Sequence, residues 1–173
     1  MADSPPGPAG RRPFMPGYGI AGPSGGRGLL PWSWAEERLA GSHDFWLATV
    51  RPDRRPHLMP VWAVWYDRSL WFSCSVGSRK TANLRAEPRC SLATDNAYEP
   101  VVLDGVADVV NDPGELAAVL ARENAKYGTS YGQELVDPEL NTTFRVRPVW
   151  VFSLDEADFT GTPTSWSFPP EPG

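Results

Sequence analysis

The stretch LATVRPDRRPHLMPVWAVWYDRSLWFSCSVGSRKTANLRAEPRCSL, residues 47–92, carries most of the signals that indicate the fold. Short runs rich in β-branched and aromatic residues alternate with turn-forming runs such as RPDRRP and DRS, which is typical of antiparallel hairpins. One helix-like segment, residues 78–87, interrupts these strands. The strands expected here cover residues 45–50, 57–66, 70–74 and 89–94.

Two adjacent cations, Arg79 and Lys80, stand where the segment 78–87 begins as a helix. A helix N-terminus carries about half a positive elementary charge, so cations in its first turn are disfavoured. Ser78 is a favourable N-cap, and Pro88 ends the segment. Because N–H groups at such a terminus bind phosphate, and Arg and Lys add charge-assisted hydrogen bonds, the pattern indicates an anion site. The alternative is a solvated basic loop.

The strand expected at residues 57–66 is apolar on both faces, because Leu58, Trp62 and Val64 alternate with Met59, Val61 and Trp65. A strand covered on both sides fits a closed barrel with outer packing, or a subunit interface.

Further strands are expected at residues 101–110 and 143–154, with Gly105 as a bulge or a site of close approach. Ser33 and Glu36 match the capping box of a short helix that ends near Gly41, and residues 112–128 match a longer helix. About six strands and two or three helices without βαβ alternation predict a mainly β (α+β) protein. The expected architecture is a six-stranded antiparallel split β-barrel with Greek-key character and added helices.

Residues 1–28 contain six prolines and eight glycines, and this composition predicts a flexible tail. The alternative is that the apolar side chains of this segment dock on the domain or on a partner subunit. The expected organisation is therefore a tail at 1–28, one domain at 29–168 and a short C-terminal tail at 169–173.

The composition is that of a soluble globular protein, with 41% hydrophobic and 21% charged residues. A net charge of −5 argues against nucleic acid as a partner, and no apolar run is long enough for a membrane span. Cys74 and Cys90 form neither a zinc pattern nor a disulfide framework, so we expect two reduced thiols in a cytoplasmic protein.

The order of these motifs resembles the flavin-binding split-barrel superfamily, often called pyridoxamine-phosphate-oxidase-like. It is most similar to the actinobacterial branch that uses the deazaflavin coenzyme F420. The resemblance rests on residues 47–92, on VVLDGVADVV (101–110), on KYG (126–128) and on TPTSWSF (162–168). It implies a homodimer in which the cofactor lies across the barrel at the dimer interface.

The resemblance also implies a set of cofactor-binding residues. Arg79 and Lys80 would hold the phosphate, with Ser78 and Asn83 nearby. Ser73 and Cys74 match a small polar pair that contacts the phosphate or the ring. The ring system would lie over Met59, Pro60 and Val61. Pro60 has no backbone N–H to donate to a neighbouring strand, so we expect this edge of the strand to face something else.

Trp166 resembles a C-terminal Trp that closes the pocket from the partner chain, with a core-anchoring aromatic as the alternative. Relatives often carry Arg before that Trp, whereas this chain has Ser165, so no phosphate or substrate contact is expected from this position. The Arg and His that bind pyridoxamine phosphate in the true oxidase have no counterpart, and that activity is not expected.

The implied function is an oxidoreductase that uses coenzyme F420 to transfer hydride to a small organic substrate, at a conjugated C=C bond. The alternatives are an FMN-dependent oxidase or reductase, or a non-catalytic flavin- or haem-binding protein. His57 could act as a general acid, although a structural role is favoured, and no catalytic residue or metal ligand is assigned. Arg51, Arg54 and Arg55 could bind a polyglutamate tail or simply form a hairpin tip.

Overall fold

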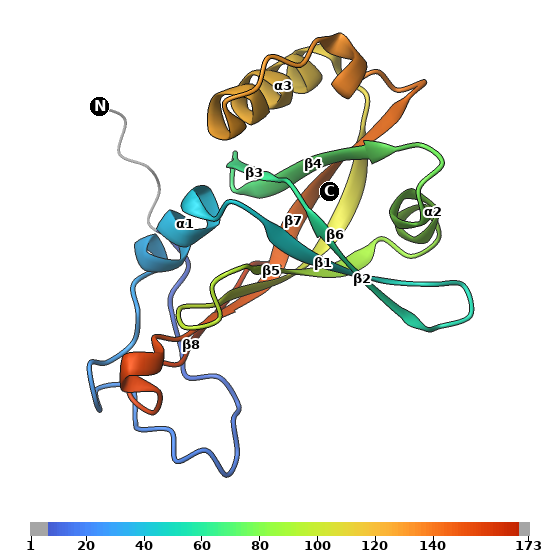
Figure 1. Ribbon diagram of the computed structural model, residues 1–173. Coiled ribbons are helices and arrows are strands. Elements are labelled where there is room, and N and C mark those ends of the chain that lie inside the picture. The colour runs from blue at the N-terminus through green and yellow to red at the C-terminus, as the bar shows by residue number, and fades with distance from the viewer. Residues whose placement is uncertain (1–6, 170–173) are drawn as a thin grey trace.

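One antiparallel sheet organises the computed structural model, which describes residues 7–169 (Figure 1). The strands follow the order β2–β1–β5–β6–β7–β4–β3, and β8 pairs with β7. Their bounds are β1 Phe45–Val50, β2 Pro56–Val61, β3 Val64–Tyr66, β4 Ser69–Ser75, β5 Arg89–Thr94, β6 Val101–Val110, β7 Asn141–Ser153 and β8 Thr164–Ser167. The sheet curls into a half-barrel with its ends at β2 and β3, which confirms a mostly β, split-barrel architecture.

The main core fills the inside of this curled sheet. Alternate residues of each strand point inward, as in Phe45, Leu47 and Thr49 of β1, all of which are buried. Leu92, Leu103 and other large apolar side chains from the neighbouring strands meet them there. Burial of these side chains is the main favourable term in folding.

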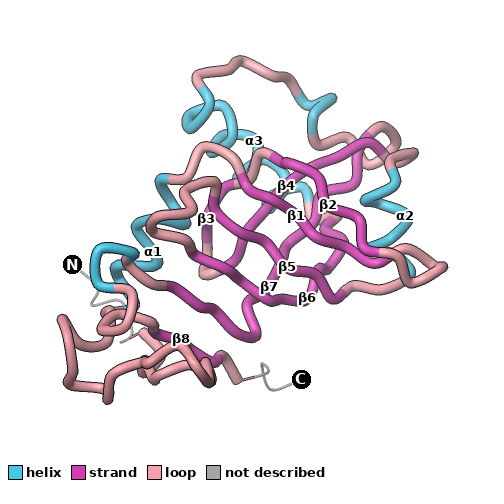
Figure 2. The backbone as a smooth tube through the Cα atoms, turned by 60° about the horizontal axis from the view of Figure 1, so that its bottom comes forward, coloured by secondary structure: helices cyan, strands magenta, loops and turns pink. Residues whose placement is uncertain are grey.

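Three helices cover the openings and one outer face of the sheet. α1 (Trp32–Gly41) and α2 (Arg79–Ala86) lie at opposite ends of the barrel, and α1 and α2 each place buried side chains in the main core (Figures 1 and 2). α3 (Pro113–Tyr127) covers the outer face of β3 and β4, where it packs on Trp71 in a second apolar cluster. Two short 3₁₀ turns, η1 (Gln133–Leu135) and η2 (Glu156–Asp158), complete the elements.

The strand expected at 57–66 is divided into β2 and β3, and the expected number of six strands is corrected to eight by this division and by β8. Trp62 and Ala63 separate the two pieces, which pair with different neighbours: β2 with β1, and β3 with β4. The side chains of α3 replace the ladder bonds at the break. Tyr127 Oη accepts from Ala63 N (2.8 Å), and Lys126 Nζ donates to Ala63 O (2.6 Å).

The helix caps agree with the sequence in two of three cases. Ser78 caps α2 and Asp112 caps α3, each accepting from a backbone N–H three residues later. The capping box expected at Ser33 is wrong, because α1 begins at Trp32 and its N-cap is Pro31, two residues before Ser33. The bulge expected at Gly105 is confirmed, since the β6–β7 register shifts there and a Cβ would come within 2.6 Å of Arg147 O.

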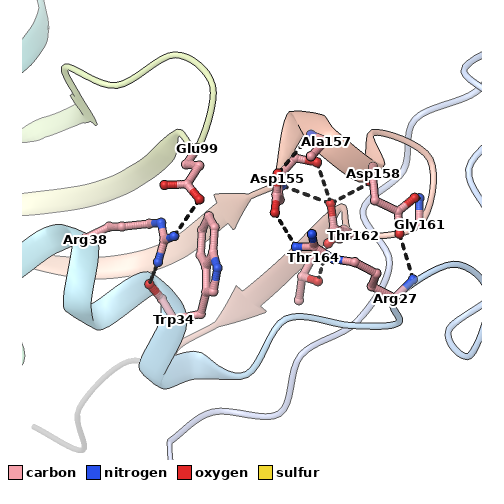
Figure 3. A network of polar contacts seen from close by, with 10 residues as sticks. All are labelled: Arg27, Trp34, Arg38, Glu99, Asp155, Ala157, Asp158, Gly161, Thr162 and Thr164. Carbon is pink, nitrogen blue, oxygen red and sulfur yellow. Dashed lines mark hydrogen bonds and ion pairs between the residues drawn. The ribbon is translucent and has the colours of Figure 1, made fainter.

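The segment 7–28 lies against the domain rather than as the flexible tail that its composition predicts; residues 1–6 are outside the described residues. Arg12 donates to the carbonyl oxygens of Gly22, Gly25, Gly161 and Pro163. Figure 3 shows how Arg27 pairs with Asp155 and how Thr162 Oγ1 donates to the carbonyl oxygens of Asp155 and Asp158. Polar contacts attach most of this segment, and the ring of Tyr18 also lies against that of Phe159, with the centroids 6.0 Å apart. The tail expected at 169–173 is described only at Pro169.

Candidate functional site

The N-terminus of α2 and the β1–β2 turn, residues 51–55, lie at the same end of the sheet (Figures 1 and 2). Both segments are basic. Arg79 and Lys80 begin α2, and Arg51, Arg54 and Arg55 belong to the turn. The structure therefore brings together two basic segments that are separated in the sequence.

Hydroxyl and thiol groups organise the first turn of α2. Ser78 Oγ accepts from Thr81 N (3.2 Å) and donates to Cys74 Sγ (3.6 Å). Thr81 Oγ1 donates to Ser75 O (2.8 Å), so the end of β4 and the start of α2 are tied together. Ser73, the other member of the expected pair, contacts Thr143 on β7 (2.9 Å).

Arg79 and Lys80 have no acidic partner among residues 7–169. The carboxylate of Asp53 feels the positive charge of Arg79, but it is bonded to another residue: its oxygen accepts from Arg55 Nε (2.8 Å). The hydrogen bonds from Arg55 lower the pKa of Asp53, and Arg51 and Arg79 make smaller contributions in the same direction. The two cations at the helix start are therefore not neutralised by the described chain.

Arg51 extends this cation cluster, which we define as Arg51, Arg79 and Lys80. Arg51 is half-buried, and its Nε is a buried donor without a hydrogen-bond partner in the part of the chain that the structure describes. A buried donor left unpaired is unfavourable, and an anion is the ligand that satisfies it and the neighbouring charges at once. The residues present thus fit a phosphate group.

His57 faces the cation cluster from β2. Burial lowers the pKa of His57, and the positive charges of Arg51, Lys80 and Arg79 lower it further. Its Nδ1 lies 3.4 Å from Thr49 Oγ1 on β1. Both effects disfavour the charged imidazolium relative to the neutral imidazole.

Asn83 lies behind this cluster, not on its surface. Its side chain is 0% exposed, and its Nδ2 donates to Thr49 Oγ1 (2.9 Å). No motif in the sequence identifies Thr49 as the partner of Asn83. The one available signal was a hydroxyl at an inward position of an apolar strand, where it needs a hydrogen bond.

Met59, Pro60 and Val61 lie on β2, at the free edge of the sheet. Val61 is buried beside Phe45, whereas Met59 and Pro60 are exposed. An edge position without a neighbouring strand is where Pro is tolerated in a sheet. Met59 and Pro60 therefore leave this edge of β2 open on its two faces, whereas Val61 belongs to the core and is not available to a cofactor.

Trp166 is separate from the cluster. Its indole is 0% exposed inside the main core, with its ring centroid 5.5 Å from that of Trp32. This is the core-anchoring role that the sequence left as the alternative. In this chain the indole has no free surface to offer a cofactor.

The fold agrees with a comparison against known protein families. The model described as "Pyridoxamine 5'-phosphate oxidase" matches residues 34–155, which is most of the chain. The chain belongs to this family. Among proteins with curated descriptions, none matches.

Solved structures of the family resemble the chain across most of its length. The conserved protein Rv2991 from Mycobacterium tuberculosis has 25% identity and a TM-score of 0.63, covering 73% of this chain and 85% of that one. A structure named F420 reductase has 28% identity and a TM-score of 0.55, and the match covers 66% of this chain and 94% of that one. HutZ, the haem storage protein from Vibrio cholerae, has 22% identity and a TM-score of 0.53, covering 68% and 86%, and shows the fold alone.

Within residues 7–169, no group of three or more His, Cys, Asp or Glu side chains is arranged to hold a metal ion. No helix in the same range is both long and apolar enough to span a membrane.

Proposed function

We propose that this family member binds coenzyme F420 with its phosphate at the cation cluster and transfers hydride between the cofactor and a small organic substrate, at a conjugated C=C bond. The observation that carries the proposal is the cluster itself. Arg79 and Lys80 are placed at a positive helix terminus without an acidic partner in the described chain, and a phosphate removes that imbalance.

The roles of the chain's residues follow from their places. Arg79 and Lys80 would bind the phosphate oxygens, and Ser78 and Cys74 would hold the first turn of α2 in position. Met59 and Pro60 on the free edge of β2 would support the ring system, and Val61 would hold that strand in the core. When bound, coenzyme F420 supplies the hydride chemistry.

The deazaflavin is preferred to FMN because the structure named F420 reductase is 28% identical to this chain and is itself 94% covered. FMN shares the phosphate and the tricyclic ring shape, so the same cluster would accept it. The test must therefore compare the two cofactors directly.

A second copy of the chain is proposed to complete the site. On the outer face of β1 and β2, Trp46, Val50 and Leu58 are all at least 40% exposed, although all three are apolar. Large contiguous apolar surfaces of this kind are usually covered by a partner. The homodimer expected from the sequence would cover this face and close the open side of the cofactor surface.

The purified protein should be titrated side by side with coenzyme F420 and FMN, and binding followed by fluorescence and absorbance. A bound deazaflavin absorbs in one band near about 420 nm, whereas FMN gives two bands near about 370 and 450 nm. We expect tighter binding of F420, followed by turnover with enone or quinone substrates. Tighter binding of FMN would replace the cofactor assignment, and tight binding without turnover over a broad substrate panel would favour a storage or sensing protein.

A further inference from the structure

His57 connects the cation cluster to the interior of the barrel. In the β1–β2 register His57 lies directly opposite Thr49, and both point to the inner face of the sheet. Thr49 is 2% exposed, whereas His57 is half-buried beside Arg51, Arg79 and Lys80. One edge of the imidazole therefore faces the buried hydroxyl of Thr49. The positive charges of the cation cluster also act on the ring.

The hydrogen bonds around Thr49 determine which nitrogen of His57 carries the proton. Asn83 Nδ2 can only donate, so Thr49 Oγ1 accepts in their 2.9 Å contact. The hydroxyl hydrogen of Thr49 is then free and buried, and His57 Nδ1, at 3.4 Å, is the one other partner that the structure gives this hydroxyl. A buried hydroxyl needs an acceptor, so Nδ1 accepts and Nε2 carries the ring hydrogen.

We propose that His57 Nε2–H donates a hydrogen bond to the phosphate of the bound cofactor, with Thr49 and Asn83 fixing the imidazole in the tautomer that can do so. The inference rests on the proposed function, because it assigns an additional ligand to the same phosphate. It gives the buried Asn83 a purpose as well: Asn83 orients the phosphate ligand rather than contacting the cofactor.

The charges of the site favour a neutral donor at this position. Three cations already face the phosphate, and a fourth positive charge beside them would be repelled before the cofactor binds. Burial and these same cations lower the pKa of His57, which favours the neutral ring over the imidazolium. The β1–β2 turn adds further titratable groups to this end of the sheet, namely Arg54 and the pair of Asp53 with Arg55, and Cys74 accepts from Ser78 at the end of β4.

The first test compares ligands with and without phosphate. Two pairs of ligands are used: FMN with riboflavin, and coenzyme F420 with its chromophore without the phosphodiester side chain. The binding of each ligand should be measured for the wild type, His57→Phe and His57→Gln. Loss of a hydrogen bond to a charged group corresponds to roughly tenfold weaker binding. We expect His57→Phe to lose this factor only for the phosphate-bearing ligands, and His57→Gln, whose amide places an N–H close to Nε2, to recover most of it.

The assignment would be overturned if the variants bound both ligands of a pair equally more weakly, or bound neither more weakly. A merely structural histidine does not distinguish a ligand with phosphate from one without it.

The second test needs neither a variant nor a flavin. Nitrogen-15 NMR of the wild type at pH 7.5 should show His57 protonated at Nε2, with the Nε2 resonance shifting on titration with inorganic phosphate.

A proton on Nδ1, or an Nε2 resonance that phosphate leaves unchanged, would contradict the inference. If the wild type bound neither flavin nor deazaflavin, the proposed function would fail, while the phosphate titration would still decide the role of His57. The two failures are therefore distinguishable.

Discussion

Arg79 and Lys80 occupy positions where a helix by itself disfavours positive charge. The dipole effect is about 0.3–1 kcal/mol for a charge in the first turn, so the apo-protein pays a small penalty for each of them. Neither side chain recovers it through an ion pair within residues 7–169. A residue pair retained at this cost is explained if its partner is a ligand.

Replacing both residues, as Arg79→Ala/Lys80→Ala, should weaken cofactor binding by roughly 100-fold, because two charge-assisted contacts to phosphate are lost. The melting temperature of the apo-protein should stay the same or rise slightly, since two unfavourable charges are removed from the helix start. Fluorescence titration and thermal unfolding without cofactor measure the two effects separately.

Arg85→Ala is the matched control, because Arg85 lies in the last turn of the same helix and donates to Thr142 Oγ1. It should leave cofactor affinity unchanged and lower stability slightly, as expected for a cation at a helix C-terminus. If the double variant instead melts earlier without cofactor, Arg79 and Lys80 are structural and the proposed site is incorrect.

At this scale the sequence predicted local chemistry better than burial. The cap at Ser78 and the two cations after it could be read from their order, because caps and dipoles depend on a few neighbouring residues. The burial of Asn83 and Trp166 could not be predicted from the order of residues. It depends on which strand packs behind the helix and on how the segment 162–168 returns to the core.

The division of β2 from β3 shows what limited prediction at the scale of elements. Residues 57–66 keep an apolar alternation throughout, so the pattern gave no sign of a break. The break is made by Tyr127 and Lys126, which reach Ala63 from a helix more than sixty residues away. By contrast, α3 was predicted nearly residue by residue, since its Asp cap, its Pro at the first position and its C-terminal Gly128 are local signals.

α3 also carries a buried acid whose titration should affect stability. Burial raises the pKa of Glu123 to about 7 from its ordinary 4.5, although the charge of Lys126 opposes the shift. Between these values the folded protein holds a proton that the unfolded chain releases, so this residue lowers stability as pH rises from about 4.5 to 7. Glu123→Gln should therefore gain about 1–2 kcal/mol relative to the wild type between pH 5 and pH 7.5, measured by urea unfolding.

Glu139→Gln controls for this measurement, because it makes the same change in charge at an exposed position. Its stability relative to the wild type should be nearly the same at both pH values. Keeping the upper limit at pH 7.5 stays below the midpoint of the titration of Lys126, for which burial lowers the pKa to about 8, and Lys126 is present in both proteins that are compared. A Glu123→Gln difference that did not change with pH would show that the carboxyl group is already ionised at pH 5.

The molecule as a whole has one outer face that its own helices leave open. α3 covers β3 and β4, while β1 and β2 present Trp46 (46% exposed) and Leu58 (58% exposed) to the surroundings. The sequence indicated this in outline, since a strand apolar on both faces needed either outer packing or a partner. Among the described residues the helices do not cover the outer face of β2, and this is the face on which we propose that a second copy lies.

If a second copy binds to this face, Leu58→Glu should weaken self-association by roughly 100-fold or more. The new carboxylate would then be buried at the interface without a partner. The fold itself should be unchanged, since Leu58 contributes little to the core of one chain. Sedimentation velocity over a range of concentrations, with circular dichroism for the fold, measures both effects. Val109→Glu is the control, because Val109 is also 44% exposed but lies at the end of β6 beyond its pairing with β5. If the wild type sediments as a monomer, the cofactor site must be complete within one chain. If both variants dissociate equally, the interface is not specific to the outer face of β1 and β2.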